Sequence, residues 1–190
     1  MRGVCVSVRT HQLFSNGRGP TLLPADEASM KIKILTVGGT IDKVYFDALS
    51  DYQVGVPGVK EILEDLPIGF EYEIESLMRK DSLDMTDEDR ALVKQKVESA
   101  EADKILITHG TDTMIETALG FNVGDKKCVV LTGALAPAGF KTSDAEFNVG
   151  MAIGVLVARA SGVHIVMNGC VFDPAKCRKN RDAQRFEVVQ

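Results

Sequence analysis

The stretch KILITHGTDTM, residues 104–114, leads from an apolar run through a turn of small and hydroxylated residues into a helical pattern. A short continuous apolar run is typical of a strand that is buried on both faces, as in parallel sheets. Helical patterns alternate with this run and with four other short β-branched or apolar runs, at residues 31–37, 71–78, 128–132 and 162–167. The alternation predicts an α/β fold with a doubly wound, mostly parallel sheet flanked by helices.

Four helices are expected between these strands. The clearest covers residues 87–100, because Thr86 is a good N-cap, three acids occupy the first turn, and Leu92, Val93 and Val97 form an apolar face. The others are expected at residues 58–66, 112–121 and from about residue 144, the last with an apolar side made of Phe147, Met151, Val155 and Leu156.

The composition is that of one soluble domain, with 190 residues, 45% of them hydrophobic and 26% charged. The 22 Lys and Arg against 27 Asp and Glu give a net charge of -5, so nucleic acid is not an expected partner. No stretch approaches the roughly 20 apolar residues that cross a bilayer, so no membrane partner is expected. Residues 1–29 are predicted to be an unstructured extension, with a targeting segment or a misplaced start codon as alternatives, and residues 30–190 to form the domain.

The cysteines and histidines indicate no metal site. The four cysteines lack a C-x-x-C pair, so we expect reduced thiols and a cytoplasmic location. The three histidines lack the short spacing of zinc ligands. We therefore expect neither a metal nor another cofactor.

Turns rich in glycine and hydroxyl groups follow the predicted strands, and in a parallel sheet they meet at one edge, where ligands bind. Gly38 and Gly39 allow close approach to a ligand and leave their N–H groups for an oxyanion, with Thr40 beside them. Thr111 and Asp112 follow another strand. Alone, each turn also fits a simpler role, a capped tight turn for the first and a helix N-cap for the second. Two threonines with a nearby aspartate favour a hydroxyl nucleophile that needs a Tyr or a Lys as its base.

The strings ILTVGGTID, residues 34–42, and ITHGTDTM, residues 107–114, resemble the two signature motifs of the bacterial-type L-asparaginase and glutaminase family. The resemblance continues through LTGALAP, SDAEFN and GVHIVMNG, so that it covers nearly everything from residue 30 to about residue 179. It implies the three-layer sandwich of the family's N-terminal domain and an amidohydrolase activity.

The resemblance assigns catalytic roles to five residues. Thr40 matches the nucleophile that attacks the side-chain amide of asparagine and forms an acyl-enzyme, and Tyr52 resembles a tyrosine that assists it from a lid. Thr111, Asp112 and Lys179 match the family's Thr-Lys-Asp constellation, in which burial favours the neutral lysine that a base requires. Alternatively, Lys179 is a solvated lysine in a basic cluster with Arg178 and Arg181.

Other matches concern the substrate. Asp112 is expected to hold its α-amino group and Ser82 its α-carboxylate, while Leu83 stands where many relatives have a glutamine. The remaining substrate-binding positions implied by the resemblance are Gly39, Asp84 and Gly110.

Family members continue past the position of Gln190 into a second, smaller domain, so this sequence is expected to hold the first domain alone. The expected function is hydrolysis of the side-chain amide of L-asparagine, with glutamine as the other candidate, by a homo-oligomer. Two alternatives stay open. One is a non-catalytic module that binds an amino acid, and the other is the ammonia-releasing, asparaginase-like subunit of glutamyl-tRNA amidotransferase.

Overall fold

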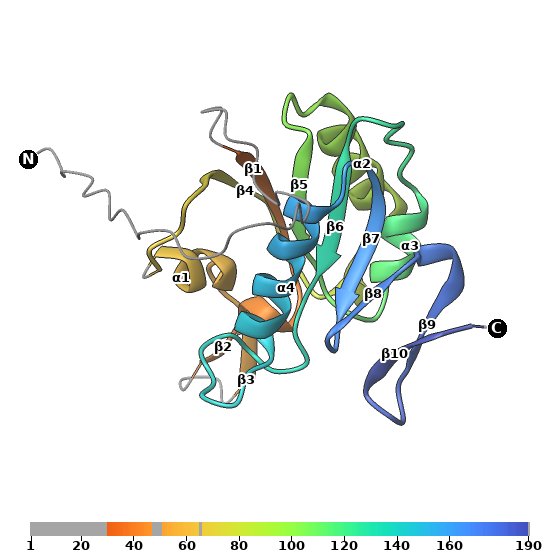
Figure 1. Cartoon of the computed structure of the whole chain (residues 1–190). Coiled ribbons are helices and arrows are strands. Elements are labelled where there is room, and N and C mark those ends of the chain that lie inside the picture. The colour runs from red at the N-terminus through yellow and green to blue at the C-terminus, as the bar shows by residue number, and fades with distance from the viewer. Residues whose placement is uncertain (1–29, 47–50, 65, 190) are drawn as a thin grey trace, which may run out of the picture.

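The computed structural model of the chain describes residues 30–46, 51–64 and 66–189, so the extension expected at residues 1–29 lies outside the described residues. The central feature is a six-stranded sheet in the order β4-β1-β5-β6-β7-β8 (Figure 1). All neighbours are parallel except β8, which is antiparallel to β7. The strands are β1 Lys31–Gly38, β4 Glu71–Lys80, β5 Lys104–Thr108, β6 Cys128–Thr132, β7 Gly162–Met167 and β8 Cys170–Phe172.

The sheet is the middle layer of three, which confirms the predicted fold class. Side chains alternate along each strand, so that Leu35 and Ile107 enter one core whereas Ile34 and Leu106 enter the other. The helices α2 Asp87–Ser99 and α3 Met114–Leu119 cover the first core. The second core lies under α1 Gly58–Glu64 and α4 Ala145–Ala158. All five predicted strands are present. The apolar runs of β5 and β6 are buried on both faces of the sheet, whereas β4, at its edge, alternates between exposed and half-buried residues over much of its length.

The crossover through α4 has the opposite hand to the other three. The steps from β5 to β6 and from β6 to β7 go in the same direction across the sheet, but α3 covers one face and α4 the other. Right-handed crossovers are the rule for parallel strands, and the connections through α1, α2 and α3 share one hand. The exceptional path of α4 places it against β5, β6 and β7, on the same face of the sheet as α1. Without α4, this part of that face would be uncovered.

The helices lie close to their predicted positions, but two of them bury faces that differ from the predicted ones. Thr86 caps α2 as predicted, through a reciprocal capping box with Asp89, but Leu92 is 37% exposed and only Val93 and Val97 of its expected face are buried. In α4 the expected face is wrong at Phe147, which is 62% exposed. The residues buried there are smaller, and this lets the helix lie close to the sheet: Ala145, Asn148, Val149, Ala152, Val155 and Leu156.

Two short hairpins were not anticipated by the sequence. The first joins β2 Lys43–Phe46 to β3 Asp51–Val54, and the second joins β9 Cys177–Asn180 to β10 Arg185–Val188. Three single-turn 3-10 helices complete the described elements: η1 Thr40–Asp42, η3 Ser82–Asp84 and η4 Pro174–Lys176. In the part of the chain that is described, no helix is both long and apolar enough to cross a membrane.

The corrected face of α4 makes a prediction about stability. Leu156→Ala should lower the free energy of unfolding by about 2–5 kcal/mol, because Leu156 is fully buried and its truncation leaves a cavity. Phe147→Ala on the same helix should change it by only about 0.5 kcal/mol. Urea denaturation followed by circular dichroism measures both values, and a larger loss for Phe147 would contradict the face assigned here.

Candidate active site

The carboxyl ends of β1 and β5 form the point where the strand order reverses, because the chain steps from β1 to β4 on one side and then returns to β5 on the other. Open α/β sheets bind ligands in the crevice at such a point. Thr40 begins the 3-10 helix η1 just after β1, and Thr111 and Asp112 lie between β5 and α3. The topology therefore brings both predicted threonines to the same crevice.

A cleft of about 310 Å³ opens at this edge of the sheet. It brings together four of the predicted catalytic residues and three that sequence reasoning did not assign to the site: Thr40, Thr111, Asp112 and Lys179, with Leu135, Arg181 and Gln184. The unassigned residues come from the turn after β6 and the turn between β9 and β10. One signal was present in the sequence: Lys179 and Arg181 are two residues apart, and on an extended chain such residues point to the same side.

Lys179 forms the centre of the cleft's hydrogen bonds. Its Nζ donates to Thr111 Oγ1 at 2.7 Å and to Asp112 Oδ1 at 2.9 Å. The Lys179 side chain is only 16% exposed, so it is not the solvated lysine of the alternative interpretation. Thr111 and Asp112 are not a helix cap either, because α3 begins at Met114, with Thr113 at its N-cap position. That start also corrects the predicted start of this helix by two residues.

Further charges surround this group. The Arg181 Nε lies 3.3 Å from the same oxygen of Asp112, Oδ1. On the η3 side, Lys43 forms an ion pair of 2.7 Å with Asp81. Burial opposes ionisation of Asp81, but its bonds to Lys43 and to the Leu83 N–H, together with the charge of Lys179, outweigh burial and lower the pKa of Asp81.

The turns after β1 and β5 touch through glycine. Gly39 has φ of +92°, and a Cβ there would collide with the backbone of Gly110. Gly110 in turn packs on Ser82, where a Cβ would lie 2.6 Å from Ser82 Oγ. The expected role of Gly39 as an oxyanion donor is wrong, because its N–H donates to Lys80 O at 2.9 Å. These glycines instead allow the two turns to approach each other.

The structure places the other substrate-binding candidates away from the cleft surface. Ser82 is 1% exposed, lies beneath Gly110, and its hydroxyl has no hydrogen-bond partner among the described residues. Asp84 ends η3 and is exposed outside the residues that line the cleft. The backbone of Tyr52 belongs to β3, paired with Tyr45 of β2, and its side chain lies outside the described residues.

Asp42 anchors the η1 turn that carries Thr40. Its carboxylate accepts the Gly58 N–H at 2.7 Å, and its backbone carbonyl accepts the Gly55 N–H at 2.7 Å. The residue is 3% exposed. Burial raises the pKa of Asp42 to about 6, although the Gly58 N–H and the charge of Arg79 act in the opposite direction.

His109 supports the second turn from below and is itself fully buried. Its Nδ1 lies 2.7 Å from the Gly110 carbonyl, which can only accept, so Nδ1 carries the proton. Nε2 then accepts from the Thr117 hydroxyl at 2.8 Å. Burial lowers the pKa of His109 to about 4, so the ring is neutral at pH 7 and holds Gly110 in place.

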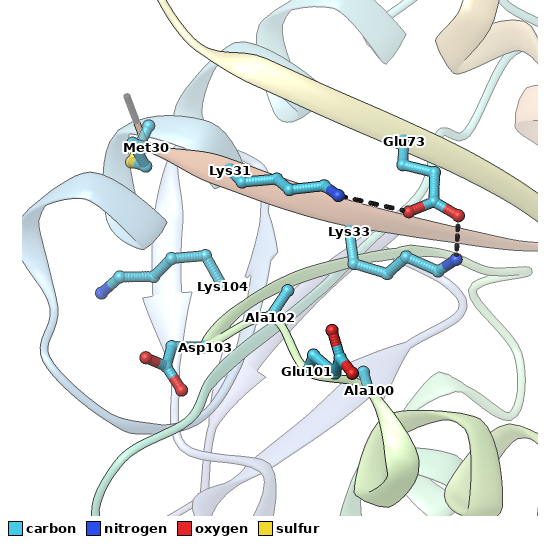
Figure 2. A pocket seen from close by; sticks show the side chains of 9 residues that line it. All are labelled: Met30, Lys31, Lys33, Glu73, Ala100, Glu101, Ala102, Asp103 and Lys104. Atoms are coloured by element: carbon cyan, nitrogen blue, oxygen red, sulfur yellow. Dashed lines mark hydrogen bonds and ion pairs between the residues drawn. The ribbon is translucent and has the colours of Figure 1, made fainter. Parts of the chain in front are cut away.

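A larger hollow of about 550 Å³ lies at the opposite, amino-terminal edge of the sheet (Figure 2). Lysine and glutamate side chains in this hollow pair with one another. Lys33 lies 2.7 Å from Glu73, and Lys31 lies 3.8 Å from the same carboxylate. Dashed lines mark both ion pairs in Figure 2. Because ligands bind at the carboxyl ends of strands in this architecture, the smaller cleft is the better candidate. The described residues also hold no cluster of three His, Cys, Asp or Glu that could bind a metal.

A family model described as "Asparaginase, N-terminal" matches residues 31–189. The chain belongs to the asparaginase family. Its sequence is 35% identical over 171 residues to L-asparaginase 2 of Escherichia coli strain K12, a match that covers 83% of this chain and 49% of the relative. It is also 31% identical over 156 residues to one component of the glutamyl-tRNA(Gln) amidotransferase of Methanosarcina acetivorans, covering 75% of this chain and 35% of that protein.

A solved asparaginase structure has the same fold. The thermostable L-asparaginase of Thermococcus kodakarensis superposes with a TM-score of 0.72 at 26% identity, covering 84% of this chain and 51% of that one. The chain thus spans about half the length of the asparaginases it matches.

The close contact of the two turns predicts that Gly39→Ala is strongly destabilising. The added Cβ meets the Gly110 backbone, and φ of +92° strains any L side chain, so we expect a loss of roughly 3 kcal/mol or more in the free energy of unfolding. Gly139→Ala is the matched control, since a Cβ there has no atom within 4 Å. Equal melting temperatures for the two variants would show that the turns are not in contact.

The buried carboxyl of Asp42 predicts a pH-dependent effect of Asp42→Asn. Because its folded pKa of about 6 exceeds the ordinary value of 3.8, the wild-type side chain favours folding most below pH 3.8 and loses that contribution as the pH rises through 6. The stability of Asp42→Asn relative to wild type should therefore rise by about 2 kcal/mol between roughly pH 4 and pH 7.

Urea denaturation at several pH values in this range measures the difference, with the exposed Asp125→Asn as control. Each variant must be measured against wild type at the same pH, because His109 has the opposite sign: its lowered pKa stabilises the fold above pH 6.5 and this contribution is lost as the pH falls towards 4. A difference that does not change with pH would contradict an ionisable, buried Asp42.

Proposed function

We propose that this protein is an amidohydrolase that converts L-asparagine to L-aspartate and ammonia through an acyl-enzyme on Thr40. The observation that carries the proposal is the bonding of Lys179 to Thr111 and Asp112 in the same cleft as Thr40. A hydroxyl nucleophile needs a nearby base, and this cleft offers a mostly buried amine already bonded to a hydroxyl. Membership of the asparaginase family supports the same reaction class.

The reaction has two stages. In the first, the Thr40 Oγ attacks the carbon of the side-chain amide while its proton passes to the base, and the C–N bond then breaks as the base gives that proton to the leaving nitrogen, which departs as ammonia. In the second, water attacks the ester of Thr40, which releases aspartate and restores the hydroxyl. Lys179 would serve as this base in its neutral form, taking the proton of Thr40 through the Thr111 hydroxyl and returning it by the same route, while Asp112 holds the amine in place from the other side.

Asp112 has a second proposed task, to bind the ammonium of the amino-acid substrate. Its Oδ1 already contacts both Lys179 and Arg181, so the ammonium would bind at the remaining carboxylate oxygen. The side chain is 28% exposed, which leaves that task sterically open.

Removal of either key group should stop the reaction. Thr40→Ala and Lys179→Met should each reduce ammonia release from L-asparagine by about a thousandfold or more, because one lacks the nucleophile and the other the base. The exposed Thr142→Ala is the control and should keep wild-type activity. The assay compares purified proteins at equal concentration, with circular dichroism to show that each is folded. Full activity of Thr40→Ala would refute the acyl-enzyme, and binding of asparagine without turnover by wild type would indicate an amino-acid sensor.

A second candidate function rests on the amidotransferase relatives, two of which match 43% and 75% of this chain. In that case the site would release ammonia from an amide for a partner protein. Purification of a stable complex with such a partner would favour this role, whereas a homo-oligomer, which we propose, would favour the independent hydrolase. We also propose a cytoplasmic location, because Cys128, Cys170 and Cys177 are unpaired within the described residues, as in a reducing compartment.

A further inference from the structure

Arg181 enters the cleft from the turn between β9 and β10, on the same side of the hairpin as Lys179. Its side chain is 69% exposed and is fixed by its Nε contact of 3.3 Å with Asp112. An ion pair that is this exposed contributes little to stability, typically about 0–1 kcal/mol. Its position over the cleft therefore calls for another explanation than the stability of the fold.

Arg181 gives the cleft a permanent positive charge. Its guanidinium keeps that charge even when Lys179 is in the neutral form that serves as a base. Asp112, which supplies the one carboxylate of the lining, is shared between Arg181 and Lys179. A ligand with an anionic group near its amide is therefore attracted to Arg181, whereas an amide without such a group is not.

Arg181 is the cation that is available to such an anion. Lys179 is mostly buried and donates to Thr111 and Asp112. The guanidinium of Arg181 contacts Asp112 through Nε, and its two Nη atoms present a planar fork that matches the two oxygens of a carboxylate. Ser82, the residue first expected to bind a carboxylate, is 1% exposed and does not line the cleft.

We propose that Arg181 is a specificity-determining residue that binds the carboxylate of the substrate and selects amides bearing a negative charge. The inference rests on the proposed amidohydrolase function and deepens it. The Arg181 Nε stays on Asp112, while the Nη groups bind the carboxylate, so that one side chain links the substrate's anionic group to the carboxylate that holds its ammonium. This arrangement fixes the orientation of the substrate with its amide towards Thr40.

The test compares L-asparagine with 3-aminopropanamide, which is asparagine without its α-carboxylate. Arg181→Gln should raise KM for asparagine about tenfold and change kcat by less than about twofold, because a charge-assisted contact to the bound substrate is lost. Its kcat/KM for 3-aminopropanamide should equal that of wild type. Arg181→Lys, which keeps the charge without the fork, should restore part of the KM.

Arg178→Gln is the matched control, because Arg178 lies on the same hairpin, is 66% exposed, and pairs with Glu187 instead of Asp112. It should leave KM for both amides unchanged. If Arg181→Gln lowers kcat/KM for both amides equally, Arg181 merely positions Asp112, and the inference is overturned while the proposed function stands. An unchanged KM for asparagine overturns it as well.

If the wild-type protein hydrolyses no amide, the proposed function fails. The role of Arg181 is then tested by measuring the binding of a carboxylate ligand. Titration calorimetry with L-aspartate should then give a Kd that Arg181→Gln weakens about tenfold and Arg178→Gln does not change. No binding by wild type, or equal binding by wild type and Arg181→Gln, overturns the inference.

Discussion

The rest of the site depends on the contact between the backbones of Gly39 and Gly110. Each glycine lies next to a proposed catalytic threonine, so the distance between the two turns sets the relation of Thr40 to Thr111. A side chain at Gly39 would push the two turns apart, because its Cβ would collide with the Gly110 backbone, and one at Gly110 would push the second turn away from Ser82. The two turns can approach because neither glycine has a side chain, and this approach sets the positions of Thr40 and Thr111.

The second support of the site is apolar. Lys179 lies opposite Phe186 in the register of the β9–β10 hairpin, and Phe186 is 4% exposed in the core that also contains Phe172. The two rings lie 6.0 Å apart. Burial of a phenylalanine ring contributes about 1.5–3 kcal/mol, which fixes the hairpin and with it an amine that must be held beside a hydroxyl. Directly opposite residues of an antiparallel pair point to the same face, so Lys179 and Phe186 lie side by side on one face of the hairpin. Phe186 packs that face on the core, and Lys179 beside it reaches the cleft. The other face carries the ion pair of Arg178 and Glu187.

The sequence predicted what apolar periodicity and the two signature motifs determine: five parallel strands, their layers, and the meeting of Thr40 with Thr111 at one edge. It did not predict the β9–β10 hairpin, whose strands have four residues each and little apolar pattern, and the adjacent charges of Arg178 and Lys179 led us to interpret Arg181 as part of a basic cluster. It misjudged α4 because a large ring such as Phe147 was expected inside, whereas the close approach of helix and sheet admits Ala145 and Ala152. The N–H of Gly39 was misassigned because its partner, Lys80, is distant in sequence.

The exceptional hand of the α4 crossover ties one wall of the cleft to the packing of the second layer. α4 lies on the opposite face of the sheet from α3 and contacts β5 as well as β6 and β7, so its packing depends on three paired strands. Asp144, just before α4, accepts the N–H groups of Leu135 and Ala136, and Leu135 lines the cleft. A substitution that loosens α4 from the sheet would therefore also displace the turn that forms this wall, far from any residue proposed to act on a substrate.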